Sequence, residues 1–300
     1  MHVVVVGSHG LLGSALIRQL TESGHHVRRL VRRPVVSPAE ISWDPHAGRL
    51  DPAALSGADA VVNLGGAGLG AHRWSTRYRR TILASRTVPT ALLARALASL
   101  DDGPRVLLQA SAIGYYGERG PQELTEESGP GQGFLVEIVQ AWEHATTPAG
   151  EAGIRVCHLR TGIVMSRTGG SFGRLLPLLR LGVGGQLGNG KNFWSWITLA
   201  DHSRAIGHLL DSEVRGPVNL TAPEPKPQGE VIRAVAHALH RPAYVRVPRF
   251  ALRAVLGAFA DDILSSQRAL PAALLGDGFE FAHPDLTTAA EWVTRTPRPR

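Results

Sequence analysis

The 300-residue chain has little cysteine and little lysine: one cysteine, Cys157, and two lysines, Lys191 and Lys226. A single cysteine excludes an intramolecular disulfide and any metal site built from several thiolates. No apolar run approaches the roughly 18 residues that would span a bilayer, and a strand expected from residue 2 leaves no room for a signal peptide. We therefore expect a cytoplasmic protein with no membrane partner.

The net charge of +7 comes almost entirely from arginine, which accounts for all but two of the 32 basic residues. The arginines are spread along the chain in short pairs and form no long basic block, a distribution more typical of GC-rich codon usage than of a nucleic-acid-binding surface. The 13 histidines show no H-x-x-x-H spacing and no cluster with glutamate, so no metal site is expected. We expect neither a nucleic-acid partner nor a bound metal.

The first strong pattern is a strand, a glycine turn and a helix. A β-branched run at 2–6 is typical of a strand buried on both faces. The glycines after it permit a tight turn, a close approach of pyrophosphate to the backbone and close packing of helix on strand. The helix N-terminus supplies free N–H groups for the phosphates. Although a glycine turn can occur without a ligand, we expect a dinucleotide to bind at Gly7, Ser8, Gly10, Leu11, Leu12 and Gly13.

The second predicted strand, residues 26–31, ends at Val31 and is followed by Arg32 and Arg33. In this type of fold an acidic residue at the end of that strand selects NAD, whereas an arginine accommodates the 2′-phosphate of NADP. No Asp or Glu is present there, which favours NADP, with Arg32 as the first candidate to bind the 2′-phosphate and Arg33 as the second. The alternative is that both are ordinary solvated arginines.

Further strands and helices alternate up to about residue 160, which predicts a doubly wound parallel sheet. The strand at 58–64 leads into Leu64, Gly65 and Gly66, which should approach the cofactor because ligands lie at the carboxyl ends of parallel strands. A long helix is expected at about 75–100, with a break possible at Pro89. Later segments, 228–242 and 248–276, are also predicted to be helical.

Several motifs resemble one family across nearly the whole chain: GSHGLLGSAL, SAIGYYG, LGVGGQLGNG, SWITLAD and QRALP. The chain is similar to atypical extended short-chain dehydrogenase/reductases of the NAD(P)-dependent epimerase family, in the subgroup often labelled nucleoside-diphosphate-sugar epimerase. The resemblance implies an α/β protein with an NADP-binding Rossmann-type domain at 1–162. A smaller α+β substrate-binding region at 163–300, partly interleaved with it, is also implied. Cofactor contacts are implied at the glycine turn, Val31, Arg32, Leu64, Gly65 and Arg86, the last on the resemblance alone.

The family's Tyr-x-x-x-Lys catalytic dyad is absent, because neither lysine lies four residues after a tyrosine. Counting back from Glu143, which fits a glutamate of the family pattern, the dyad positions hold Leu135 and Val139. The chemistry needs a phenol whose pKa is lowered by a neighbouring cation.

The remaining catalytic candidates are Ser111, as a carbonyl anchor, and Tyr115 or Tyr116, as a proton donor assisted by Arg119 or a cofactor hydroxyl. The alternative is that the two tyrosines only pack beside the nicotinamide.

These patterns predict an NADP-dependent oxidoreductase or epimerase. It would act by hydride transfer on a small molecule whose identity the sequence does not give, with sugar nucleotides among the candidates. The absent dyad keeps a second reading open, namely a protein that binds NADP without catalysis and acts as a sensor or structural partner. The oligomeric state is not predicted.

Overall fold

The computed structural model describes residues 1–295, which form two compact units whose segments alternate along the chain. Unit 1 comprises residues 1–115, 134–160 and 203–218, and unit 2 comprises 116–133, 161–202 and the chain from 219 onward. The chain passes from unit 1 to unit 2 between Arg160 and Thr161. The sequence places the domain boundary at residue 162.

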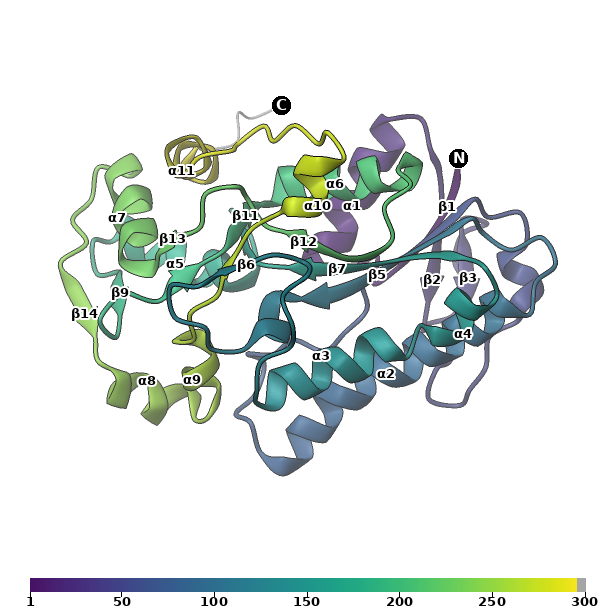
Figure 1. The fold of residues 1–300 in the computed structure, drawn as a ribbon, viewed down its shortest axis with the longest axis horizontal. Coiled ribbons are helices and arrows are strands. Elements are labelled where there is room, and N and C mark those ends of the chain that lie inside the picture. Colours follow the sequence, from purple (N-terminus) through teal and green to yellow (C-terminus); the bar gives the residue numbers. More distant parts are fainter. Residues whose placement is uncertain (296–300) are drawn as a thin grey trace. The chain divides into compact units, whose positions relative to one another are not determined.

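A seven-stranded sheet in the order β12-β7-β5-β4-β1-β2-β3 forms the centre of unit 1 (Figure 1). The strands β3, β2 and β1 are neighbours in the order 3-2-1, and the crossover to β4, on the other side of β1, begins the second half, as in the Rossmann fold. The β1–β2, β1–β4, β2–β3 and β4–β5 pairs are parallel. This topology confirms the predicted fold class. Its strands are β1 (His2–Val6), β2 (His26–Val31), β3 (Glu40–Ser42), β4 (Ala60–Asn63), β5 (Val106–Ala112), β7 (Arg155–Thr161) and β12 (Gly216–Leu220).

Helices cover both faces of this sheet, with α1 and α6 on one face and α2, α3 and α4 on the other (Figure 1). The long helix predicted at 75–100 is α2, and Pro89 lies inside it without ending it. The bounds are α1 (Leu11–Glu22), α2 (Thr76–Ala98), α3 (Phe134–His144), α4 (Thr147–Glu151) and α6 (Leu199–Asp211), with 3-10 turns at Pro52–Leu55 and Ile113–Tyr116.

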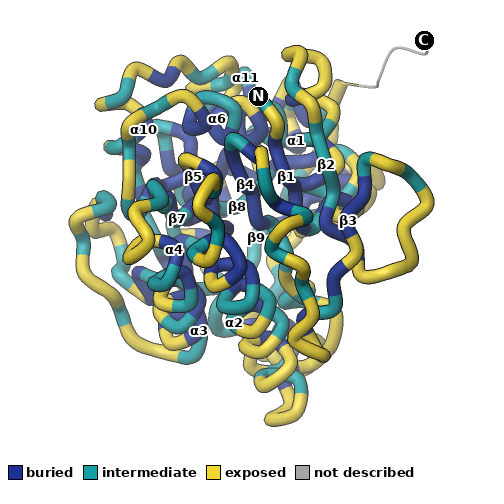
Figure 2. Tube along the Cα trace, turned by 90° about the vertical axis from the view of Figure 1, so that its right-hand side faces the viewer, coloured by how far each residue is buried: buried dark blue, intermediate teal, exposed yellow. Residues whose placement is uncertain are grey.

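The middle strands of the sheet are almost completely buried (Figure 2). In β1 the four valines are at most 3% exposed, which explains why the run is continuously apolar rather than alternating. The register places Val6 opposite Asn63 at the carboxyl ends of β1 and β4, and Asn63 opposite Gln109 in the middle of β5. The buried Asn63 amide donates to Gln109 Oε1 at 2.9 Å and to Thr90 Oγ1 at 3.1 Å. Polar side chains thus begin where these apolar strands end.

Unit 2 is built from short strand pairs and helices around its own core, in which the aromatic side chains Phe172, Trp194 and Trp196 are buried. The strands are β6 (Glu123–Leu124), β8 (Ile163–Met165), β9 (Gly185–Leu187), β10 (Phe193–Trp194), β11 (Trp196–Thr198), β13 (Lys226–Pro227), β14 (Val245–Val247) and β15 (Arg268–Ala269). The helices are α5 (Gly170–Arg180), α7 (Gln228–Ala238), α8 (Arg249–Leu256), α9 (Phe259–Ile263), α10 (Ala272–Gly276) and α11 (Leu286–Thr294).

The predicted helix at 248–276 is wrong as a single element. Gly257 has φ +62° and ends α8, because glycine adopts this left-handed conformation without a Cβ penalty. After α9, Arg268 and Ala269 form β15, which pairs with β6. The pairing partner lies about 145 residues earlier in the chain, so local periodicity could not reveal it. No helix within residues 1–295 is long and apolar enough to cross a membrane.

His202 is a titratable group completely buried in unit 2. Its Nε2 lies 3.3 Å from Thr161 Oγ1, and its Nδ1 is buried without a hydrogen-bond partner among the residues described. Burial lowers the pKa of His202 from 6.5 to about 4, because the imidazolium would lose its hydration. The folded protein therefore holds this side chain neutral.

We expect His202 to make the protein acid-sensitive between pH 6.5 and pH 4. Its contribution is fully present above pH 6.5, and at pH 4 a loss on the order of 3 kcal/mol follows from the lowered pKa. The measurement is urea unfolding at pH 7.5 and pH 4, in which H202Q should lose less stability on acidification than the wild type. H46Q, which replaces an exposed histidine, should keep the wild-type pH dependence. Equal pH dependence in wild type and H202Q would contradict this prediction.

Candidate functional site

The glycine turn after β1 is shaped by two close backbone approaches that exclude side chains. Gly7 has φ +80°, and a Cβ there would lie 2.8 Å from the Leu64 carbonyl carbon and oxygen. A Cβ on Gly13 would lie 2.3 Å from the Gly7 oxygen. The Gly10 N–H donates to the Gly7 oxygen at 3.0 Å and closes the turn. Gly7 and Gly13 must therefore be glycine, and the turn sits directly against the segment that follows β4.

The first turn of α1 offers backbone donors to an anion. Gly10 is its N-cap, and no side-chain hydrogen bond caps the helix. The N-terminal N–H groups of a helix lack partners inside the helix and lie at its positive end. Gly10 itself is exposed, Leu11 and Leu12 are half-buried, and Ser8 is buried. This cradle fits the pyrophosphate of a dinucleotide, which requires backbone donors and no intervening side chain.

The two arginines after β2 have different surroundings. Arg33 forms an ion pair with Glu40 at 2.6 Å, and this hydrogen-bonded partner lowers the pKa of the Glu40 carboxyl to about 2. Arg32 is exposed and makes no hydrogen bond or ion pair within residues 1–295. It lines a hollow of about 440 Å³ together with Arg33, Pro34, Ser42, Trp43, Asp44, Arg49, Leu50 and Asp51. Of the two candidates, only Arg32 has its guanidinium available for a phosphate.

The loop after β4 is held in place by Arg86. Its guanidinium donates to the Ile82 oxygen at 3.2 Å and the Ala67 oxygen at 3.0 Å, and lies 5.0 Å from the Trp142 ring. A Cβ on Gly66 would lie 3.3 Å from Arg86 Cζ. Arg86 is only 9% exposed, and burial lowers its pKa to about 10. The structure brings Arg86 to the backbone that follows Leu64 and Gly65, the same loop predicted to approach the cofactor.

The positions of the absent catalytic dyad are occupied by apolar contacts. Leu135 lies in the first turn of α3, and a Cβ on Gly114 would be 3.4 Å from its Cβ. Val139 is buried. The position expected for the tyrosine is therefore next to Gly114 in the segment after β5, and it carries no titratable group.

Ser111 belongs to a buried polar network that the sequence did not reveal. Its hydroxyl donates to Glu143 Oε1 at 2.6 Å. The same carboxylate receives Arg160 Nε on Oε1 and Arg160 Nη2 on Oε2, both at 2.9 Å. The Arg160 guanidinium lies 3.5 Å from the centroid of the Tyr115 ring. Arg160 and Ser111 are at most 5% exposed. In the sequence, Glu143 serves only to locate the dyad positions of the family pattern. No local sequence motif identifies Arg160 as a member of the site.

Tyr116 lies in unit 2, and its surroundings there are those of a core residue. Its ring is fully buried, and its hydroxyl donates to Asn219 Oδ1 at 2.7 Å. The guanidinium of Arg119, predicted to assist a tyrosine, donates to the backbone oxygens of Tyr116, Gly129 and Pro130. Arg160, rather than Arg119, is the cation that the structure places against a tyrosine ring. Whether Ser111, Tyr115 or Tyr116 takes part in proton transfer stays a prediction.

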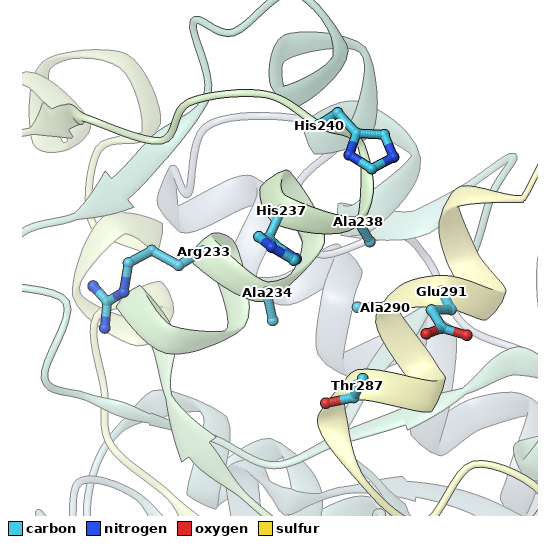
Figure 3. A pocket seen from close by; sticks show the side chains of 8 residues that line it. All are labelled: Arg233, Ala234, His237, Ala238, His240, Thr287, Ala290 and Glu291. Atoms are coloured by element: carbon cyan, nitrogen blue, oxygen red, sulfur yellow. The ribbon is translucent and has the colours of Figure 1, made fainter.

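A separate hollow of about 540 Å³ lies in unit 2 between α7 and α11 (Figure 3). It contains none of the predicted site residues. Its lining consists of Arg233, Ala234, His237, Ala238, His240, Thr287, Ala290 and Glu291. Figure 3 shows the Arg233 guanidinium directed away from α11. No group of three His, Cys, Asp or Glu side chains within residues 1–295 is placed to hold a metal ion.

Two family descriptions match the chain. That of the NAD dependent epimerase/dehydratase family covers residues 3–221, and that of a domain of unknown function, DUF1731, covers residues 247–293. Among named proteins, the epimerase family protein Mb2239 of Mycobacterium bovis is 41% identical over 297 residues, which cover 98% of both chains.

Solved structures of two relatives share the fold. The human epimerase family protein SDR39U1 (isoform 2), solved with NADPH, superposes with a TM-score of 0.90 at 31% identity, covering 98% of this chain and 99% of that one. The nucleoside-diphosphate sugar epimerase from Corynebacterium glutamicum superposes with a TM-score of 0.79 at 34% identity. This chain is covered to 98% in that comparison but spans only 58% of the Corynebacterium chain.

We expect the Glu143 carboxylate to be a major source of stability in unit 1. E143A leaves the buried Arg160 guanidinium without its counter-ion and should lower the free energy of unfolding by about 3 kcal/mol. S111A removes one charge-assisted hydrogen bond and should cost about 1.5–3 kcal/mol. Denaturant unfolding followed by circular dichroism measures both. E291A, which removes an exposed pair with Arg295, should change stability by less than about 0.5 kcal/mol. An equally small effect of E143A would contradict the buried network.

Proposed function

Because the chain belongs to the NAD dependent epimerase/dehydratase family, we propose that it binds NADP(H) and is an oxidoreductase or epimerase. It would act by hydride transfer on an unidentified small molecule. The solved human relative carries NADPH. The single cysteine of this chain, Cys157, is buried and reduced, which suits a cytoplasmic protein.

The observation that carries this proposal is the cradle in unit 1. Gly7 and Gly13 leave no room for side chains, and the first turn of α1 is uncapped. These N–H groups would hold the pyrophosphate. Arg32, at the carboxyl end of β2, would bind the 2′-phosphate that distinguishes NADP from NAD. Arg33 is a weaker candidate because Glu40 already occupies its guanidinium.

The remaining cofactor contacts would come from the edge of the sheet. Val31 ends β2 beside Arg32, and Leu64, Gly65 and Gly66 follow β4 at the carboxyl ends of the parallel strands, where ligands of this fold lie. Arg86 would act here by fixing the Gly66–Ala67 backbone, and its own guanidinium edge faces the same loop. When bound, the nicotinamide supplies the hydride acceptor or donor.

A side chain of the protein would have to donate a proton to the substrate oxygen, or accept one from it, during hydride transfer. Tyr115 is the better candidate, because it is half-buried and its ring lies on the Arg160 guanidinium, whereas the Tyr116 hydroxyl is enclosed with Asn219. Ser111 would contribute by holding Glu143, which in turn orients Arg160 beneath Tyr115. Arg160, on β7, would thus take the role of the family's lysine as the cation beside the phenol, although the lysine position itself holds Val139.

A second function is favoured by a specific observation: the dyad positions hold Leu135 and Val139, and the hydroxyls of Ser111 and Tyr116 already have protein partners. A protein that binds NADP(H) and serves as a sensor or structural partner would need no proton-transfer group. Both functions share the cofactor site and differ only in turnover.

Cofactor selectivity tests the Arg32 assignment. R32A should weaken NADPH binding by about 10- to 100-fold, since a charge-assisted hydrogen bond is worth about 1.5–3 kcal/mol, and should leave NADH binding unchanged. Fluorescence titration with each nucleotide measures this. R18A, on the exposed face of α1, serves as the control and should bind both as the wild type does. NADPH binding that is absent in the wild type, or insensitive to R32A, would refute the assignment.

Measuring turnover distinguishes an enzyme from a protein that only binds NADP(H), and it distinguishes Tyr115 from Tyr116 as the proton donor. A screen of carbonyl and alcohol compounds by NADPH absorbance should find a substrate, and on that substrate Y115F should reduce kcat by at least about 100-fold. Y116F should lose about 1 kcal/mol of stability but turn over like the wild type, because its hydroxyl serves the core of unit 2. Full activity of Y115F would remove Tyr115 from the mechanism. A screen without any substrate would favour the second function.

A further inference from the structure

One stretch of unit 1 carries positive charge without any compensation in the sequence. Residues 60–100 contain six arginines and no Asp or Glu, although acidic residues occur on average once per twelve positions in the whole chain. Three of the six lie at the start of α2: Arg77, Arg79 and Arg80, which we call the arginine cluster. Codon usage can explain arginine in place of lysine, but it does not explain the absence of acids.

The position of the arginine cluster is electrostatically unfavourable for the protein alone. Its members lie in the first turns of α2, which begins at Thr76 and has no acidic residue in its first turn. The N-terminal end of a helix carries partial positive charge, so cations there add to the charge instead of offsetting it. None of the three guanidinium groups forms an ion pair or hydrogen bond within residues 1–295. By contrast, carboxylates or backbone carbonyls bind the guanidinium groups of Arg33, Arg86 and Arg160.

Arg79 is ordered by aromatic rings rather than by an anion. Its guanidinium lies 4.7 Å from the centroid of the Phe134 ring and 5.8 Å from that of Trp74. The two rings contact each other edge to face at 5.2 Å. Arg79 Nε is buried and has no hydrogen-bond partner. A planar guanidinium stacked in this way is already oriented, so little rotamer entropy is lost when it binds an oxyanion.

The cluster begins α2, which follows the loop at the carboxyl end of β4, where ligands of this fold lie. The preceding loop is fastened to α2, because Tyr78 Oη donates to the Gly68 oxygen and the Ala67 N–H donates to Ser85 Oγ. Phe134 begins α3 and is followed by Leu135, which lies against Gly114 in the segment after β5. Arg32 follows β2, three strands away from β5, a distance of about 14 Å at the usual strand spacing.

We infer that the arginine cluster binds the anionic group of the substrate, a phosphate or a carboxylate, beside the reactive end of the cofactor. This inference rests on the proposed function, because only an enzyme has a substrate. It concerns residues different from those of the cofactor cradle. A phosphate and a carboxylate both match the guanidinium fork. The 2′-phosphate of the cofactor is not the ligand of the cluster, because it is expected to bind Arg32.

The test is anion binding to the whole protein saturated with NADPH, which fills the cofactor's own phosphate sites. Isothermal titration at constant ionic strength with inorganic pyrophosphate and, separately, citrate should show saturable binding of at least one. Binding of pyrophosphate alone identifies a phosphate-bearing substrate, and binding of citrate alone identifies a carboxylate. The R77Q/R80Q double variant replaces two exposed side chains and should weaken that binding at least tenfold while NADPH affinity stays within about twofold.

R95Q is the matched control, because Arg95 is exposed at the other end of the same helix. It should leave anion binding and NADPH binding unchanged. The inference is overturned if neither anion binds saturably, if R77Q/R80Q binds as tightly as the wild type, or if R77Q/R80Q loses NADPH affinity to the same extent.

Failure of the proposed function would be recognised separately. If the wild type does not bind NADPH, the same titrations on the protein alone compare R77Q/R80Q with R32A. Loss of anion binding in R77Q/R80Q but not in R32A still supports the cluster. Loss in R32A alone overturns it.

Discussion

The carboxylate of Glu143 holds three elements of unit 1 in fixed positions, because it accepts hydrogen bonds from Ser111 on β5 and Arg160 on β7 while it lies on α3. An ion pair this well buried carries a desolvation cost, so it is stable only when every oxygen is satisfied. Ser111 and the fork of Arg160 meet that condition. The same carboxylate fixes the Arg160 guanidinium against which the Tyr115 ring packs.

The arginines named here fall into two groups, those whose guanidinium binds a carboxylate or a backbone oxygen and those without such a partner. Arg33 and Arg160 are held by carboxylates, and Arg86 by backbone oxygens and the ring of Trp142. These groups support loops and strands and have little capacity left for a ligand. Arg32 and the arginine cluster have no such partners within residues 1–295, and both follow strands at the carboxyl edge of the sheet, Arg32 after β2 and the cluster after β4. An NADP molecule and an anionic substrate laid along that edge would satisfy both sets of charges.

The absence of a lysine changes the chemical problem more than it changes the fold. The helix that would carry the dyad is present as α3, in the expected position against segment 111–115, but Leu135 and Val139 turn an acid–base surface into a packing surface. The catalysis proposed above would use a phenol, Tyr115, beside an arginine on the neighbouring strand β7. An arginine remains protonated throughout the useful pH range, so it can stabilise a phenolate but cannot exchange the proton itself.

The sequence by itself determined the strand, glycine turn and helix at the N-terminus, the alternation of strands and helices that predicts a doubly wound parallel sheet, and the missing dyad. Each of these follows from local periodicity or from the presence of a residue type at a position. Only the tertiary structure decided which arginine is free after β2, where the Ser111 hydroxyl points and why Tyr116 belongs to a core, and it divided the predicted helix at 248–276. These outcomes depend on partners that local periodicity does not encode. Glu40 reaches Arg33 from the neighbouring strand β3, whereas Glu143 is 32 residues from Ser111 and Asn219 is 103 residues from Tyr116.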